Sequence, residues 1–262
     1  MTMTTKSLLC TSVAALLSLS SAKAGLITQF GFNAAGGGNN INEATGWDGT
    51  TAGAGGSLDA NLTLSQTLQI AGSFVAGSGT DVFHVDKWHS AASDRANQIT
   101  LGNSVRFTVA ANAGYEINLG TGVGSFSTRM HDHFTGSNGN LMFDRVALFI
   151  NGVDLGDQVY THTTYGPEVL SAPQTLTWNF GANSLLNGLS SAQARLYFWA
   201  SDGAAADPTG DDAHGPQWDT ADNATIQLNG SVDLIAVPEP TTFAVGAGLF
   251  VVGALRRRRS AR

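Results

Sequence analysis

Apolar and polar residues alternate through much of the chain between residues 25 and 236, the pattern of strands that bury one face. The clearest case is the segment around Phe107, where Val105 and Val109 fall on the same side while Arg106 and Thr108 fall on the other. Similar runs predict strands at 26–32, 58–64, 67–75, 105–109, 115–119, 146–150, 174–180, 195–200, 226–228 and 232–234. Helical signals are few, so the pattern indicates an all-β domain.

Two Asn-Gly pairs lie between apolar runs and predict tight hairpins. These are Asn151-Gly152 and Asn229-Gly230, and both residue types tolerate the positive φ that two-residue hairpin turns require. Many short strands with turns between them are typical of an antiparallel β-sandwich of jelly-roll or lectin-like type. We therefore expect one such domain over 25–236, with a Gly-rich stretch at 25–57 that is expected to be loose.

The first 24 residues have the features of a signal peptide. A basic Lys6 precedes an apolar stretch, and Ala22 and Ala24 supply the small-x-small pattern that signal peptidase cuts. Cleavage is expected before Gly25, after export by the Sec machinery. The chain's single cysteine lies in this segment, so the mature protein is expected to form no disulfide.

The last 26 residues combine three features in a fixed order. The turn Val237, Pro238, Glu239 and Pro240 comes first, the apolar run 241–255 follows, and Arg256, Arg257, Arg258 and Arg259 close it. As a helix the apolar run would extend roughly 22 Å, against a hydrocarbon core of about 30 Å. A helix this short is expected to be held in the membrane only transiently, with the arginines on the cytoplasmic side.

This order of turn, apolar run and arginines resembles the PEP-CTERM sorting signal of Gram-negative bacteria. The resemblance implies that a membrane enzyme, exosortase, recognises Pro238-Glu239-Pro240 and removes the tail. The passenger is then released or attached to the outer envelope or to extracellular polysaccharide. Such tails also carry the label of an ice-binding-protein C-terminal region, and an ordinary membrane anchor is the alternative interpretation.

Three segments of the passenger also look like a recurrent β-sandwich module found with such tails. They are Phe107-Thr108-Val109 with Gly114–Leu119, then Arg195–Ser201, and finally Asp222–Val232. The resemblance implies a lectin-like sandwich and assigns no activity.

Charge is strongly lopsided in the predicted mature segment. From Gly25 to Val237 there are six bases and nineteen acids, a net charge of −13. A polyanionic surface argues against nucleic acid and anionic membranes as partners, and it favours divalent cations, neutral glycans, or simply solubility outside the cell.

The best metal candidate is an acidic segment at 201–223, read as a loop. Its expected ligands are Asp207, Asp211, Asp212, Asp219 and Asp222. Carboxylates on a flexible loop suit Ca²⁺, although the spacing is not that of an EF-hand. The alternative is a solvated acidic loop.

Other candidates are aromatic or imidazole groups. Trp88, Trp199 and Trp218 are candidate platforms for stacking on sugar rings, with packing in the core as the alternative. His131 and His133 share one side of a strand and could address a metal, but the Glu that a cupin-like site needs does not follow them.

No catalytic motif is present: there is no Gly-x-Ser-x-Gly elbow, His-Glu-x-x-His or Walker loop. We therefore expect a non-catalytic protein of the cell envelope or extracellular matrix that is structural or binds glycan. The alternatives are a carbohydrate-active enzyme on a jelly roll, since two carboxylates suffice for glycosidase chemistry, and an ice- or surface-binding protein.

Overall fold

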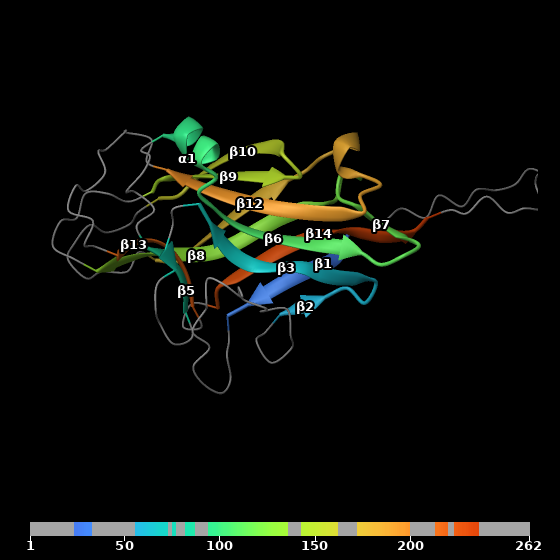
Figure 1. The fold of residues 1–262 in the computed structure, drawn as a ribbon, viewed down its shortest axis with the longest axis horizontal. Coiled ribbons are helices and arrows are strands. Elements are labelled where there is room, and N and C mark those ends of the chain that lie inside the picture. The colour runs from blue at the N-terminus through green and yellow to red at the C-terminus, as the bar shows by residue number, and fades with distance from the viewer. Residues whose placement is uncertain are drawn as a thin grey trace, which may run out of the picture.

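The computed structural model describes residues 24–32, 56–72, 75–76, 82–86, 94–135, 143–161, 172–199, 213–219 and 223–235. Within these ranges the chain forms antiparallel strands arranged in two sheets (Figure 1). The all-β prediction is therefore confirmed. The expected signal peptide, most of the Gly-rich stretch and the C-terminal 27 residues, 236–262, lie outside the described residues.

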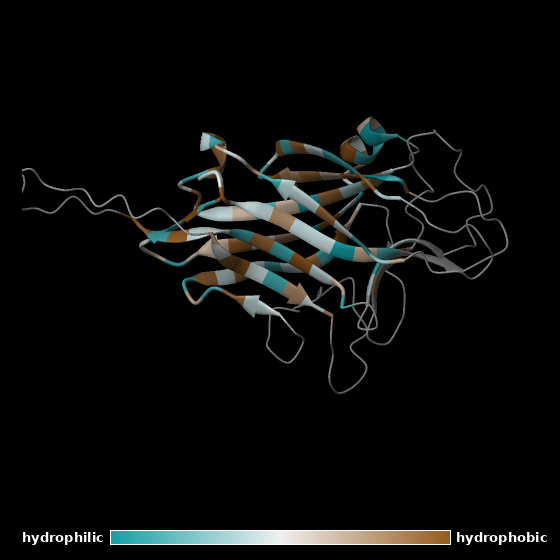
Figure 2. Cartoon of the chain, turned by 180° about the vertical axis from the view of Figure 1, so that it is seen from behind, coloured by the Kyte–Doolittle hydropathy of each residue, from teal (hydrophilic) through white to brown (hydrophobic). Residues whose placement is uncertain are grey.

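The larger sheet has nine strands in the order β2-β1-β14-β8-β13-β5-β4, with β11 added beside β8 and β7 beside β14. These strands are β1 (Gly25–Gly31), β2 (Ser57–Leu58), β4 (Val75–Ala76), β5 (Val82–Asp86), β7 (Tyr115–Asn118), β8 (Ser125–Thr135), β11 (Gln174–Asn179), β13 (Ala213–Asp219) and β14 (Thr225–Leu234). Figure 2, seen from behind, shows brown and teal bands alternating along the strands, as expected where one face is buried.

The smaller sheet has five strands in the order β10-β9-β12-β6-β3. They are β3 (Leu62–Ala71), β6 (Ser104–Ala111), β9 (Arg145–Ile150), β10 (Val153–Val159) and β12 (Ser191–Trp199). One α-helix, α1 (Arg95–Leu101), precedes β6, and a 3-10 turn, η2 (Ser184–Leu186), precedes β12.

Side chains from both sheets meet in one apolar core. The Phe107 ring on β6 lies 4.7 Å from the Phe30 ring on β1 and 6.4 Å from the Phe126 ring on β8, measured between centroids. Val105 and Val109 are buried with Phe107, while Arg106 and Thr108 between them face outward and are half-buried. The alternation read from the sequence therefore assigns the two faces of β6 correctly.

The predicted hairpin at Asn151-Gly152 is confirmed. The two residues join β9 to β10 with φ angles of 49° and 81°, the positive values that a type I′ turn requires at both central positions. Asn151 Oδ1 also accepts the Gln193 N–H at 2.8 Å, which ties the turn to β12.

The predicted hairpin at Asn229-Gly230 is wrong, because β14 continues through both residues. Up to Asn229 the strand pairs with β8, and from Ser231 it pairs with β7. A Cβ on Gly230 would lie 2.7 Å from the Asn118 backbone oxygen and 2.8 Å from Ile27 Cδ1, closer than neighbours can approach. This glycine is needed for close packing where the strand changes partner, and makes no turn.

The predicted strand at 58–64 is also corrected. The Asp59 carboxylate accepts the Asn61 N–H at 2.8 Å, and the Asp59 carbonyl accepts the Leu62 N–H at 3.0 Å. This local turn ends β2 at Leu58, and β3 then runs without interruption from Leu62 to Ala71.

The acidic segment contains a strand where a loop was predicted. β13 occupies 213–219 and pairs with β8 through Gln217 and with β5 from Gln217 onward. Pro216 lies on the part of β13 that pairs with β8 alone, so its missing N–H breaks no bond to β5.

Within the described ranges, no helix is long and apolar enough to cross a membrane.

Candidate functional site

Trp218 is a core residue, which corrects its predicted role as a sugar-stacking platform. Its side chain has no exposed surface, and its indole Nε1 donates a hydrogen bond of 2.8 Å to Thr128 Oγ1. The ring packs 5.5 Å from Phe83 and 6.2 Å from Phe198, between centroids. No face of this indole is open to a pyranose ring.

Trp199 lies on the opposite side of β12 from Phe198, as the alternation predicted. Phe198 belongs to the main core, whereas Trp199 forms a small second cluster with Ala147 and Tyr197 on the outer face of the five-stranded sheet. Only 6% of Trp199 is exposed, so it too is packed and offers little surface for stacking.

The remaining predicted ligands are dispersed or lie outside the described part of the chain. Asp219 is the last residue of β13, and His131 is buried on β8. Trp88, Asp207, Asp211, Asp212 and Asp222 lie outside the described residues, as do the residues of the expected sorting signal from Val237 onward. Among the residues that the structure describes, no group of three His, Cys, Asp or Glu side chains is placed to hold a metal.

Helix α1 covers part of the outer face of the five-stranded sheet. Asp94 caps its start by accepting the Asn97 N–H at 2.8 Å, and Gly102 ends it in the left-handed conformation. Ile99 packs against the second cluster, so the helix shields Tyr197 and Trp199 from water.

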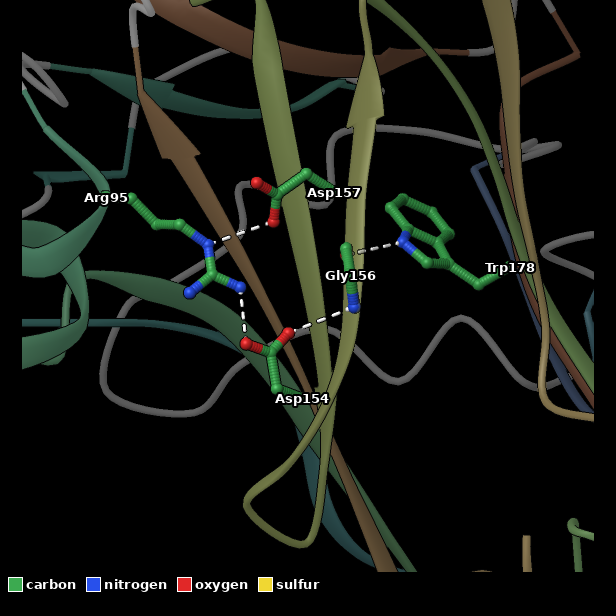
Figure 3. A network of polar contacts seen from close by, with 5 residues as sticks. All are labelled: Arg95, Asp154, Gly156, Asp157 and Trp178. Atoms are coloured by element: carbon green, nitrogen blue, oxygen red, sulfur yellow. Dashed lines mark hydrogen bonds and ion pairs between the residues drawn. The ribbon is translucent and has the colours of Figure 1, made fainter.

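Arg95, the first residue of α1, fixes the helix to β10. Its Nη2 lies 2.5 Å from Asp154 Oδ2, and its Nε lies 2.9 Å from Asp157 Oδ1 (Figure 3). The guanidinium carbon is also 5.5 Å from the Phe149 ring centre and 5.8 Å from the Trp199 ring centre, which are cation–π distances. The charge of Arg95 is thus matched by two carboxylates.

This pairing changes the acidity of Asp154. Partial burial alone would raise the pKa of the carboxyl, but the Arg95 hydrogen bond, the Gly156 N–H and the Arg95 charge together hold that pKa below its ordinary value. Asp154 and Asp157 flank an irregularity in the register of β10 with β9. There, the Gly156 carbonyl accepts the Trp178 Nε1–H at 2.9 Å, which ties β10 to β11 of the other sheet (Figure 3).

The other half of this outer face is polar, and a chain of side-chain hydrogen bonds crosses β12, β6 and β3. Gln193 Nε2 donates to Gln66 Oε1 at 3.2 Å and to Thr108 Oγ1 at 3.3 Å, and Thr108 Oγ1 donates to Gln66 Oε1 at 3.0 Å. Gln66 Nε2 then donates to Gln69 Oε1 at 3.1 Å. The half-buried amides are therefore held in one orientation. Figure 1 shows the three strands side by side.

Two arginines border this polar network directly opposite each other. Arg195 on β12 is the register partner of Arg106 on β6. Arg195 Nε donates to Gln193 Oε1 at 2.7 Å, whereas Arg106 Nε is buried without a hydrogen-bond partner. Within the described ranges neither guanidinium has a carboxylate partner. We call Gln66, Gln69, Arg106, Thr108, Gln193 and Arg195 the arginine–amide face.

Sequence reasoning did not identify this face as a site. The alternation showed that Arg106, Thr108, Arg195 and Trp199 lie opposite the core, but it gave no register between β6 and β12. Strand pairing brings the two arginines together although they are 89 positions apart in the chain.

Comparisons with known proteins leave the family open. No protein-family model matches the chain, and no curated protein matches it. Among solved structures, it is similar to an acetyl xylan esterase, Est2A, from the rumen bacterium Butyrivibrio proteoclasticus, with 11% identity and a TM-score of 0.28. The match covers 69% of this chain and 32% of the esterase chain, and a score this low supports no inference about activity.

Proposed function

We propose that the chain is an exported protein of the cell envelope or extracellular matrix of a Gram-negative bacterium. A lectin-like β-sandwich acts there as a structural or glycan-binding component and not as a catalyst. A PEP-CTERM-type tail, processed by an exosortase-like enzyme, delivers it.

The observation that carries this proposal is the fit between the folded domain and the expected processing points. β1 begins at Gly25, the first residue after the expected signal-peptidase site, and β14 ends at Leu234, three residues before Val237. Both signals can therefore be removed without cutting a strand of the domain.

The ends of the domain also lie close together. Gly25 is the register partner of Gly230, four residues before the end of β14. Trp199 and Ala213, which flank most of the acidic segment, lie at the other end of the molecule, because Ala213 pairs with Thr135 at the far end of β8 (Figure 1). A domain held by its tail would thus turn the end with Leu234 toward the membrane and the end with Trp199 away from it.

Processing is tested on protein recovered from producing cells. Mass spectrometry of the wild-type chain should give a form that starts at Gly25 and lacks the arginine-rich end, in the outer envelope or the medium. Replacing Pro238, Glu239 and Pro240 with alanine should leave the full tail attached and the protein in the inner membrane. A wild-type chain that keeps its tail would contradict the sorting proposal.

Binding is tested by retention of the recovered protein on the cells' own extracellular polysaccharide, with Ca²⁺ and then with EDTA. Retention supports the glycan-binding role, and its absence under both conditions leaves the structural role.

Calcium is tested separately, through stability. If the acidic segment binds Ca²⁺, the ion should raise the melting temperature, and Asp211→Ala with Asp212→Ala should abolish that rise. A rise that persists in this double variant would place the ion elsewhere.

A further inference from the structure

We infer that the arginine–amide face binds carboxylate groups of an acidic polysaccharide. The inference rests on the proposed function and specifies its ligand: a polymer that carries uronate-type carboxylates, held by Arg106 and Arg195 with the neighbouring amides in contact with sugar hydroxyls.

The placement of Arg106 and Arg195 costs the protein folding stability. Like charges directly opposite each other on neighbouring strands destabilise a sheet, and Arg106 and Arg195 are register partners. The buried Arg106 Nε adds the cost of a donor with no acceptor. Acids are abundant in this protein, with nineteen in the mature segment, yet no described acid is paired with either arginine. A costly arrangement whose charges have no carboxylate partner among the described residues is typical of a binding site.

The geometry of the free donors suits a carboxylate. Gln193 Oε1 takes the Nε–H of Arg195, which fixes the guanidinium and leaves its two terminal nitrogens without a partner among the described residues. Opposing Cβ atoms on paired strands are about 5 Å apart, so two guanidinium groups can address one carboxylate between them. Arginine suits this task because its planar fork matches the two oxygens of a carboxylate.

The surrounding chemistry favours a sugar polymer as the carrier of the carboxylate. Gln66, Thr108 and Gln193 present a half-buried row of amide and hydroxyl groups, already oriented by mutual hydrogen bonds. Such groups exchange hydrogen bonds with sugar hydroxyls at little cost in ordering. An extended polysaccharide can follow this row across β12, β6 and β3.

The net charge of −13 over residues 25–237 sets the conditions of binding. It opposes the approach of a polyanion at long range, but exposed charges farther apart than about 8 Å are largely screened at physiological ionic strength. Contacts between guanidinium and carboxylate are short and survive this screening. The net charge led us to expect neutral glycans, whereas the local pair of arginines favours acidic ones.

The test uses the full-length protein in mild detergent, at 0.15 M salt with EDTA, and immobilised polygalacturonate as the probe. The same polymer with its carboxylates fully methyl-esterified is the matched control. The wild-type protein should bind the acid form, and Arg106→Gln with Arg195→Gln should weaken binding at least about tenfold. Arg129→Gln with Arg145→Gln, which removes the same charge elsewhere, should weaken it less than about twofold.

Folding is checked in the same samples by thermal unfolding, where the glutamine variant should be at least as stable as the wild type because a repulsion is removed. Arg106→Lys with Arg195→Lys keeps the charge and loses the fork, so it should bind between the wild type and the glutamine variant.

Four results would overturn the inference. The first is unchanged binding by the glutamine variant, and the second is equal binding of the methyl-esterified polymer. The third is that the wild type binds dextran sulfate but does not bind polygalacturonate. The fourth is that the wild type binds no polymer and forms a dimer, which the glutamine substitutions dissociate. If the wild type does not bind polygalacturonate but is retained on the cells' own polysaccharide, this inference is wrong and the proposed glycan-binding function stands. If it binds neither polymer, the glycan-binding part of the proposed function fails with it.

Discussion

The outer face of the five-stranded sheet has two halves, which differ in whether their arginines have carboxylate partners. In one half, which α1 covers, Arg95 at the start of the helix lies over two aromatic rings and pairs with Asp154 and Asp157. We call this the capped half. In the other, Arg106 and Arg195 oppose each other with no described carboxylate beside them. One row of register partners, which reads Gln69, Arg106, Arg195, Phe149 and Asp154, crosses both halves.

The presence or absence of a carboxylate partner distinguishes Arg95, which stabilises the fold, from Arg106 and Arg195, which are available to a ligand. The charge of Arg95 is matched within the chain, so the chain gains stability from it. The charges of Arg106 and Arg195 raise the free energy of the folded state, and an external anion would lower it. Substitutions in the capped half should therefore lower stability and leave binding intact, whereas substitution of Arg106 or Arg195 should raise stability and weaken binding.

The largest effect is expected from Trp199→Ala in the capped half. Removing a nearly buried indole leaves a cavity beneath α1, and substitutions of this kind cost about 3 to 5 kcal/mol in the free energy of unfolding. Chemical denaturation measures the loss, and Trp199→Phe should lose less. Binding to polygalacturonate should persist at temperatures where the variant is folded. A change below about 1 kcal/mol would show that the second cluster does not stabilise the domain.

Arg95→Ala comes next, with an expected loss of about 1 to 2 kcal/mol from two partly exposed ion pairs and the cation–π contacts. Arg95→Gln is the control that retains much of the side chain's apolar stem. Thermal unfolding should show a loss that shrinks at high salt, because the ion pairs are screened. If Arg95→Ala also abolished polymer binding, the division into two halves would be wrong.

Arg106→Gln alone should raise stability, by about 0.2 to 1 kcal/mol, because it removes repulsion between paired strands. Once one arginine is replaced, replacing Arg195 as well should add less than it does on its own, since no repulsion remains. A double-mutant cycle on thermal unfolding measures this coupling. Additive or destabilising effects would mean that the two charges do not oppose each other in solution.

The sequence predicted the two faces of the strands far better than their pairing. Alternation assigned Phe107 and Phe198 to the core and Arg106 and Trp199 to the opposite side, because side-chain direction in a strand is a local property. The meeting of Arg106 with Arg195 depends on register between distant segments, which no local pattern encodes. Helix α1 was not predicted, because its seven residues show little apolar periodicity; its caps at Asp94 and Gly102 are known only from the structure.

Local signals also failed where tertiary packing overrode them. The same Asn-Gly pair makes a turn at Asn151-Gly152 and continues a strand at Asn229-Gly230, where Asn118 and Ile27 require a residue without Cβ. Trp218, which lies in the acidic segment, was a candidate for stacking on sugars, yet β13 carries it into the core beside Phe83. Neighbours in the sequence are thus a poor guide to burial in this domain.

The smallest effect concerns pH in the capped half. Because the folded-state pKa of Asp154 is lowered, its contribution to stability is complete above the unfolded value, near 4, and is lost as pH falls through the folded value. Asp154→Asn should therefore lower the free energy of unfolding at pH 7 by about 0.5 kcal/mol or less, because the pair is this exposed, and the difference from the wild type should vanish in strong acid. Arg106→Gln provides the contrast, since an arginine without a carboxylate partner should have the same effect on stability across this pH range. A stability difference between Asp154→Asn and the wild type that stayed constant down to pH 2 would mean that Arg95 does not stabilise the charged form of Asp154.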